Sequence, residues 1–288
     1  MSSKPSLLYE ELPPPERWRE FLECCWHAVD RAPRADRPAE HIVPDGCPEI
    51  IVHLGDPFSR RVETGWRRQG RAFLAGTLSR PWSLRAGRVV DTFGMRFRPG
   101  ALPLLLVVDM RSTVDRELPL ARLAGVAAAR RLRQHLAAAP DLAARAAAAT
   151  AWLAEVGGEA PAPSATPCTR AVGLIRAGRG GVRVDEVASE LGRSRRQLER
   201  AFVTGLGIGP KLYSRIVRLQ AALVEIDAAE RGASVDAALA AGYFDQSHLL
   251  RDFRTLAGRP AARSRQADGE MSRHFTAPQR LLALLAGE

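Results

Sequence analysis

Long apolar runs and a secretory leader are both missing from this sequence. The longest apolar stretch, Ala101 to Val108, is interrupted by Pro103 and is far too short to span a bilayer. The segment from Met1 to Pro15 is polar and rich in proline, without the apolar centre of a signal peptide. We therefore expect a cytoplasmic protein that does not enter a membrane.

Paired cysteines are missing as well. The four cysteines form no CxxC pair: Cys24, Cys25, Cys47 and Cys168. Neither a zinc ribbon nor a disulfide framework is therefore indicated. His41, Cys47 and His53 lie near Asp45 and Glu49 and could supply metal ligands, but no His-x-His pair is present. Scattered side chains of this kind on strands usually face core or solvent, and we expect neither a metal nor a cofactor.

What the sequence does have is an excess of positive charge. The formal net charge of the 288 residues is +10, and the pI is about 10.5. Such basicity favours a polyanionic partner, either nucleic acid or an acidic membrane surface. The hydrophobic content of 46% is enough for a sizeable core, and the length suits about two domains.

The first 123 residues have the pattern of a β-rich domain. Residues 50–54 form a short apolar run, and Phe93, Met95 and Phe97 alternate with polar residues or glycine, as in a half-buried strand. Turn signals such as those at 44–46 and 98–100 separate the runs. We expect a barrel-like domain over residues 1–123.

The following residues change to alanine, leucine and arginine. Their helix propensity predicts a helical connector over 124–157, broken into two helices at Pro140-Asp141. Residues 158–167 contain several prolines and small residues and are typical of a linker. The fold class is therefore α+β, with a β-rich domain, a helical segment and a second, all-α domain.

An internal repeat lies beyond the linker. Residues 187–192 predict a short helix that ends in a glycine turn, and Ser194 then caps a second helix with Gln197 three residues later. This second helix buries Leu198 and Phe202, four residues apart. The unit therefore reads as a helix-turn-helix.

The same pattern returns about 50 residues later. Ala188 and Gly192 match Ala238 and Gly242, an offset of 50. With one extra turn residue, the next five positions match at an offset of 51: Ser194, Leu198, Arg200, Phe202 and Gly207 with Asp245, Leu249, Arg251, Phe253 and Gly258. The sequence thus predicts two helix-turn-helix units. Two such units on one DNA face would enter successive major-groove segments about 34 Å apart.

A long helix is predicted between the two units. Pro210 stands at its start, where the missing N–H has no cost. One apolar stripe runs along it: Ile216, Leu219, Leu223 and Ile226. A stiff connector of this kind fixes the spacing of the two capped helices.

Four stretches of this region resemble the AraC/XylS type of transcription regulator: 194–202, 207–213, 218–222 and 242–253. The resemblance covers residues 168–265 and implies a DNA reader of two helix-turn-helix units joined by a long helix. One departure concerns the end of the reader, where the family often has a proline and, three residues later, Tyr-Arg. After Pro260 this chain has Arg263 but no tyrosine, so the resemblance does not specify how the last turn packs. Residues 266–288 form a tail that could contain a further helix.

The amino-terminal half resembles a largely uncharacterised domain that precedes this reader in some regulators. Residues 43–51 and 95–100 carry that similarity. In the wider family this position holds a sensing or dimerising domain, often cupin-like. Besides double-stranded DNA, the candidate partners are thus a small-molecule effector, a second copy of the chain and RNA polymerase.

The resemblance also implies roles for individual residues. The base contacts of the first unit would be Arg196, Glu199 and Arg200. Those of the second would be Gln246, Ser247, Leu250 and Arg251. Phosphate contacts would come from Arg193, Arg195 and Lys211. The alternative is an ordinary solvated helix face that does not contact DNA. For Glu199 and Leu250 the two interpretations are about equally supported, whereas for Arg200 and Arg251 the DNA contact is favoured.

Two other functions compete with sequence-specific regulation. Pro167-Cys168-Thr169-Arg170 is similar to the Pro-Cys-His-Arg of DNA-repair alkyl-transferases, but Thr169 stands where their activating histidine would be. A nonspecific architectural DNA binder is the other alternative, and two spaced recognition helices argue against it. The leading hypothesis is a non-enzymatic, sequence-specific transcription regulator of AraC/XylS type.

Overall fold

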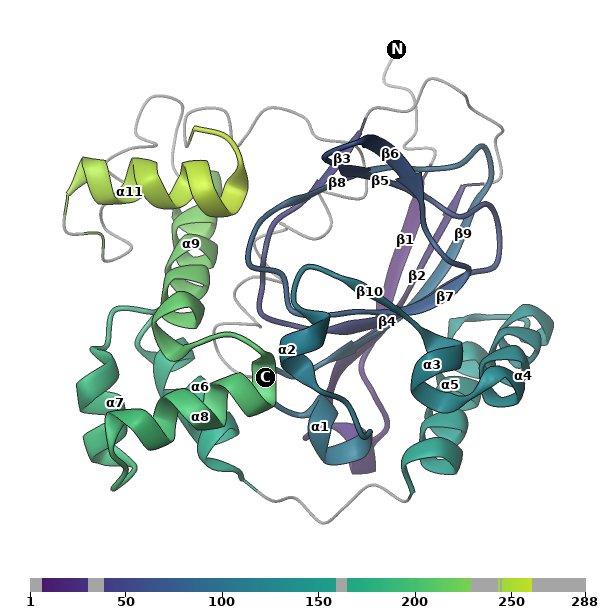
Figure 1. Ribbon diagram of the computed structural model, residues 1–288. Coiled ribbons are helices and arrows are strands. Elements are labelled where there is room, and N and C mark those ends of the chain that lie inside the picture. Colours follow the sequence, from purple (N-terminus) through teal and green to yellow (C-terminus); the bar gives the residue numbers. More distant parts are fainter. Residues whose placement is uncertain (1–6, 31–38, 159–164, 229–242, 244, 261–288) are drawn as a thin grey trace.

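The computed structural model describes residues 7–30, 39–158, 165–228, 243 and 245–260 (Figure 1). An amino-terminal domain of antiparallel sheets with helices is followed by a helical carboxyl-terminal region, which confirms the predicted α+β fold class. Three predicted features lie outside the described residues: the helix around Ala238 that would open the second unit, most of the linker, and the 266–288 tail.

Two antiparallel sheets form the amino-terminal domain. The first has six strands in the order β1 (Leu8–Leu12), β2 (Leu22–Asp30), β9 (Val90–Phe97), β4 (Glu49–His53), β7 (Ala72–Ala75) and β10 (Glu117–Pro119). The second has four in the order β3 (Glu40–Ile42), β8 (Trp82–Arg85), β5 (Ser59–Val62) and β6 (Gly65–Arg68). The expected strands at 50–54 and 93–97 correspond to β4 and the end of β9.

The two sheets face each other across an apolar layer. Trp26, Phe58, Phe73 and Trp82 are among its buried side chains. The interior is lined by alternate residues of strands from both sheets, as the period-2 pattern requires. This arrangement leaves a partly open cavity between the sheets.

Strand β9 departs from its predicted half-buried pattern. Arg96 and Gly94, expected on the solvent side, are buried together with Phe93, Met95 and Phe97. The Trp26 ring covers Gly94 so closely that a Cβ there would stand 2.1 Å from its Cε2 atom. Alternation failed as a guide here because both faces of β9 are covered, one by helices and one by the second sheet.

Helices α3 (Leu120–Ala124) and α5 (Leu142–Gly157) pack against the outer face of the six-stranded sheet, and α4 (Val126–Ala138) packs against both of them (Figure 1). The helix break predicted at Pro140-Asp141 is present, because the Asp141 side chain accepts a hydrogen bond from the Ala144 N–H and caps α5. Trp152 Nε1 donates to the Ala128 carbonyl at 2.9 Å and ties α5 to α4. Three short helices complete the domain: η1 (Glu16–Trp18), α1 (Leu102–Leu105) and α2 (Met110–Thr113).

The carboxyl-terminal region contains α6 (Pro167–Ala177), α7 (Val184–Glu190), α8 (Arg195–Leu206), α9 (Pro210–Ala228) and α11 (Gln246–Asp252), with a π-helical turn η2 (Phe253–Ala257). Three of these helices begin with a side-chain cap. Thr166, Ser194 and Asp245 each accept from the backbone N–H three residues later, and Gln197 completes the predicted capping box at Ser194.

Helix α9 is more deeply buried than its sequence indicated. The predicted stripe is in the core, but so are Tyr213, Val217, Gln220 and Val224 on other sides of the helix. The cause is a second neighbour: besides the helices of its own region, α9 contacts the loop between β3 and β4 of the amino-terminal domain. Among the helices of the described ranges, none combines the length and the apolar character needed to cross a membrane.

Candidate functional site

Helix α8 has a buried side and a charged side. Leu198 and Phe202 are fully buried, as predicted, and anchor the helix to the core of its region. Arg196 and Arg200 are exposed on the other side, and Glu199 is half-buried next to them. The Ser194 cap fixes where the helix starts and so sets the direction of these side chains. This charged side has the composition of a helix that reads base edges in a major groove.

Helix α11 repeats this division. Leu249 and Phe253 are fully buried, whereas the side chains expected to meet DNA are exposed: Gln246, Ser247, Leu250 and Arg251. Leu250 is 38% exposed, an unusual position for a large apolar side chain, and it suits contact with a thymine methyl group. Asp252 is buried beneath the helix and accepts from Arg215 Nε of α9 at 2.9 Å. That bond fixes α11 to the connecting helix.

The three residues expected at phosphates are all exposed: Arg193, Arg195 and Lys211. Arg193 and Arg195 flank the Ser194 cap, and Lys211 lies in the first turn of α9. Arg195 Nη1 also lies 3.5 Å from Asp185 Oδ1, both largely solvent-accessible, so this pairing is weak and can give way to a phosphate.

The amino-terminal domain borders the charged side of α8. Helices α1 and α2 pack against α8, and Gly207 at its end is so close that a Cβ would stand 2.4 Å from the Met110 carbonyl oxygen. The residues from Val108 to Arg111 line a shared groove with Arg196, Glu199 and Arg200. Helix α8 is therefore flanked by another domain at the side chains expected to read DNA.

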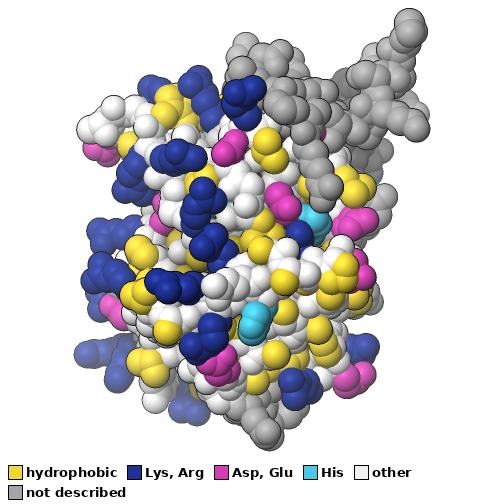
Figure 2. Space-filling model, turned by 90° about the vertical axis from the view of Figure 1, so that its right-hand side faces the viewer, with side chains coloured by type: hydrophobic (Ala, Val, Ile, Leu, Met, Phe, Trp, Pro, Cys, Tyr) yellow, Lys and Arg dark blue, Asp and Glu magenta, His cyan; other side chains and the backbone are white. Residues whose placement is uncertain are grey.

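Positive charge alone does not locate the interface. Figure 2 views the molecule from the side of the β-rich domain and α3–α5, and Lys and Arg side chains gather along one side of that face too. Arg122, Arg130 and Arg133 are exposed on the helices there. Not every arginine of this domain is exposed: Arg60 lies buried on β5, stacked on the Trp82 ring at 4.1 Å and paired with Glu117 at 3.0 Å.

Cys168 is not placed for nucleophilic chemistry. It lies in the first turn of α6 with 4% of its surface exposed, against Gly205 of α8 and Gly100. Burial raises the pKa of its thiol to about 12, so the reactive thiolate does not form near neutral pH. The geometry gives no support to the alkyl-transferase alternative.

A buried polar network joins the two domains. Arg176 of α6 pairs with Glu23 of β2 at 2.8 Å, donates to the Tyr213 hydroxyl at 3.1 Å, and approaches Cys47 Sγ at 3.8 Å. Burial by itself would lower the pKa of Arg176, but its electrostatic interactions with Tyr213, Glu23 and Cys47 outweigh burial and raise that pKa. Sequence analysis missed this network, because no local pattern indicates that an arginine of one domain is neutralised by the other.

One loop of the amino-terminal domain contacts the carboxyl-terminal region at several points. We call residues 43–48, between β3 and β4, the 43–48 segment. Val43 belongs to the core cluster of the carboxyl-terminal region, and Pro44 accepts a hydrogen bond from Gln220 of α9. Gly46, with a φ of +83°, lies against the Tyr213 ring. The resemblance noted over residues 43–51 therefore includes a segment that contacts the other domain.

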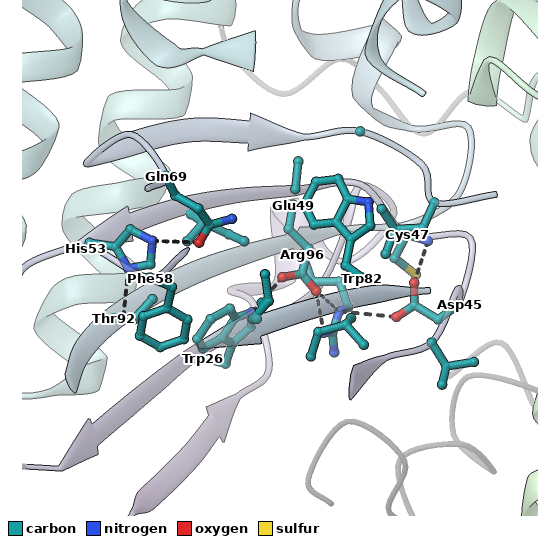
Figure 3. Close-up of a pocket in the computed structure, with 17 residues that line it drawn as sticks. Trp26, Asp45, Cys47, Glu49, His53, Phe58, Gln69, Trp82, Thr92 and Arg96 are labelled. Carbon is teal, nitrogen blue, oxygen red and sulfur yellow. Dashed lines mark hydrogen bonds and ion pairs between the residues drawn. The ribbon is translucent and has the colours of Figure 1, made fainter. Parts of the chain in front are cut away.

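The same segment closes a cavity between the two sheets, called here the sheet cavity, with a volume of about 60 Å³. Its polar side chains form two groups (Figure 3). At one end, His53 bonds Thr92 at 3.0 Å and Gln69 at 3.2 Å. At the other, Arg96 donates to Glu49 at 2.5 Å and lies 3.7 Å from Asp45. The rings that line it are Trp26, Phe58 and Trp82.

The residues considered as metal ligands are engaged with other partners. His53 is held by Thr92 and Gln69, Asp45 and Glu49 by Arg96, and His41 Nε2 lies 3.4 Å from Ser83 Oγ. Over the described ranges, no three His, Cys, Asp or Glu side chains gather in a way that could hold a metal ion. Sequence analysis did not single out several residues that line this site: Trp26, Phe58, Gln69, Trp82, Thr92 and Arg96.

Comparison with known proteins finds two separate matches along the chain. Residues 187–267 match the family described as "Helix-turn-helix domain", and residues 10–119 match a domain of unknown function, DUF6597. The predicted AraC-type helix-turn-helix domain is thereby confirmed at the carboxyl end. No curated protein matches the chain.

Several solved structures are similar in fold. ToxT from Vibrio cholerae has a TM-score of 0.48 at 8% identity, with 82% of this chain and 96% of that chain covered. ToxT of strain SCE256 with a bound unsaturated fatty acid has a TM-score of 0.42 at 9% identity, covering 80% and 95%. A cupin_2 domain of an XRE family transcriptional regulator from Enterobacter cloacae has a TM-score of 0.25 at 14% identity, covering 33% and 98%.

Proposed function

We propose that this chain, whose carboxyl-terminal part is an AraC-type helix-turn-helix domain, is a sequence-specific transcription regulator that reads two successive major-groove segments. One observation carries the proposal: α8 and α11 are both capped helices with a buried apolar pair and an exposed arginine, joined by the buried helix α9. Arg200 and Arg251 hold equivalent positions in the two helices. Each can donate bidentately to guanine O6 and N7.

The amino-terminal domain is the regulatory part in this proposal. Its α1 and α2 flank the charged side of α8, and its 43–48 segment contacts α6 and α9. An effector bound in the sheet cavity would therefore act on a wall that touches the DNA-binding region. We also propose that this domain mediates dimerisation and that the chain contacts RNA polymerase.

The test begins with an operator selected from a pool of randomised DNA. Arg200→Ala and Arg251→Ala are each expected to lose about 1–3 kcal/mol of binding to that operator and to relax the preference at a guanine. Arg133→Ala, exposed on α4, is the matched control, because it removes the same charge away from both recognition helices. Unchanged operator affinity in both variants would overturn the assigned contacts, and equal affinity of the wild type for all sequences would overturn sequence-specific reading.

A further inference from the structure

The outer face of the four-stranded sheet carries three arginines around one tryptophan. Arg61 of β5 lies opposite Trp66 of β6, while Arg68 of β6 and Arg85 of β8 both lie opposite Ser59. Because side chains alternate along a strand, these four residues share the face that is turned away from the sheet cavity, and none of them lines that cavity. We call Arg61, Trp66, Arg68 and Arg85 the basic sheet face.

Trp66 holds two of these arginines by stacking. The Cζ atom of Arg85 lies 4.0 Å from the centre of the Trp66 ring, and that of Arg61 lies 5.7 Å from it. A guanidinium that stacks on a ring uses its flat side, so the N–H donors at its edge stay available to another partner. A planar fork of such donors matches the oxygens of a phosphate. The stacking therefore orients the donors without occupying them.

The charge of the basic sheet face is not balanced by a carboxylate. Within the part of the chain that the structure describes, its three arginines form no ion pair, and all three are exposed. The other outward positions of this sheet are His41, Ser59 and Ser83, which carry no acid. By contrast, Arg60 and Arg67 alternate with the outward positions, and both pair with Glu117. The inward arginines are thus neutralised, whereas the outward ones are available to an anionic partner.

The basic sheet face lies close to the second helix-turn-helix unit. Pro81 directly precedes β8, and a Cβ on Gly258, at the end of η2, would stand 2.9 Å from the Cγ atom of this proline. Arg85 ends the same strand four residues later, roughly 13 Å along an extended chain. Figure 1 shows the four-stranded sheet and α11 at the same end of the molecule. A duplex held by α11 would therefore pass within reach of this face.

We infer that the basic sheet face binds the phosphate backbone of the double-stranded DNA that flanks the operator on the side read by α11. Arg61, Arg68 and Arg85 donate to phosphate oxygens, and such contacts position DNA without reading its sequence. A duplex is favoured over an acidic protein because the face adjoins a unit that itself holds DNA. The inference rests on the proposed function, since α11 must hold DNA to bring the flank to the sheet.

Duplexes of different length test the flank. One carries only the selected operator, and two others add about two helical turns of arbitrary sequence at one end or at the other. With the flank next to the half-site of α11, the wild type is expected to bind at least fivefold more tightly, and its slope of log Kobs against log salt to steepen by about two to three, because each neutralised phosphate adds about 0.9. An equal gain from the opposite flank would overturn the placement. No gain from either flank would overturn the contact with DNA and would leave the face to an acidic protein.

A triple variant locates the contact: Arg61→Gln, Arg68→Gln and Arg85→Gln combined. It is expected to lose both the gain in affinity from the flank and the added slope. The matched control removes the same charge from exposed positions on α3 and α4 by combining Arg122→Gln, Arg130→Gln and Arg133→Gln. The control should keep both effects. A gain retained by the first variant, or lost equally in the control, would overturn the location.

A single change covers the case in which the triple variant fails to fold. Arg68→Gln leaves the contacts of Arg61 and Arg85 with Trp66 in place. It is expected to reduce the added slope by about one. Thermal unfolding of each variant shows whether it is folded, and an undiminished added slope in a folded Arg68→Gln protein would be the contrary result.

A duplex of arbitrary sequence separates this inference from the proposed function. On that duplex the triple variant of the sheet should show a shallower salt slope than the triple control, whether or not the chain prefers any operator. A shallower slope would support the sheet contact even if the operator experiment failed. Equal slopes would overturn the sheet contact and leave the reading of an operator by Arg200 and Arg251 untouched.

Discussion

Gly46 lies directly against the ring of Tyr213: a Cβ on the glycine would stand 2.5 Å from the Cε2 atom of the tyrosine. Gly46 belongs to a loop of the β-rich domain, and Tyr213 is fully buried in a helix of the DNA-binding region. The two domains therefore meet here without room for one additional carbon. A contact this tight makes the position of the helix depend on the position of the loop.

We predict that Gly46→Ala separates the two domains locally. The added methyl group and the positive φ both oppose the observed backbone, so we expect a loss of about 2–4 kcal/mol in stability. Gly125→Ala is the matched control, because Gly125 has a φ of +86° but nothing within 4 Å of its Cβ position. Thermal unfolding should show a larger loss for Gly46→Ala. An equal loss in both variants would mean that the backbone conformation, and not the Tyr213 contact, is responsible.

We predict that Glu23→Gln strongly destabilises the protein. The change leaves the Arg176 guanidinium buried without its anion, which costs about 3–5 kcal/mol. Glu225→Gln is the control, since the pair that Glu225 makes with Arg179 is partly exposed and contributes only about 0–1 kcal/mol. Urea unfolding at pH 7 measures both, and similar losses would contradict a structural role for the buried pair.

We predict that His53 makes the protein less stable in mild acid. Its pKa is about 4 in the folded protein against 6.5 when exposed, because burial disfavours the charged ring. The unfolded chain therefore binds the proton first, and stability is lost as pH falls from about 6.5 toward 4, by up to about 3 kcal/mol. Urea unfolding at pH 7 and pH 5 should show a smaller difference in His53→Gln. The exposed His135→Gln should retain the full difference, and a full difference in His53→Gln would exclude His53 as its source.

We predict that Lys211 contributes to affinity without contributing to specificity. A phosphate contact releases a counterion, so Lys211→Ala should reduce the slope of log Kobs against log salt by about one. The ranking of operator variants should stay as in the wild type. Filter-binding titrations over a salt series make the measurement. An altered ranking would instead make Lys211 a base contact.

We predict that Cys168 stays inert. With its thiol pKa raised to about 12 by burial, it should react with iodoacetamide far more slowly than an exposed thiol near pKa 8.5. Alkylated DNA should leave it unmodified in a mass-spectrometric assay. Transfer of an alkyl group from DNA to Cys168 would revive the enzyme alternative.

The sequence was informative where structure is local. Ser194 and Asp245 correctly indicated the starts of two helices, because a capping side chain and the N–H that it accepts from lie within four residues. The spacing of Leu198 and Phe202 correctly indicated the buried side of α8. The break at Pro140-Asp141 has the same local origin. The assignment of Arg200 and Arg251 to base edges remains a prediction.

The rest of the site depends on residues far apart in the chain. The alternation of residues 93–97 predicted that Arg96 faces solvent. Arg96 is instead buried, and Glu49 on the neighbouring strand β4 neutralises its charge. Gln220 lies outside the predicted apolar stripe of α9, and its side chain donates to the Pro44 carbonyl of the other domain. No periodicity within one element encodes such pairings, because they arise only when the second sheet and the second domain are in place.

Helix α9 has a consequence for any attempt to use the DNA-binding region as a detachable module. Its surface around Tyr213 and Gln220 is covered by the other domain, so cutting the chain after Gly158 would lay a buried aromatic ring and a buried amide open to water. Such a fragment is expected to aggregate unless those positions are redesigned. Transplanting this region onto a foreign sensor would therefore require carrying the 43–48 segment with it, so the smallest exchangeable piece is larger than the helical region itself.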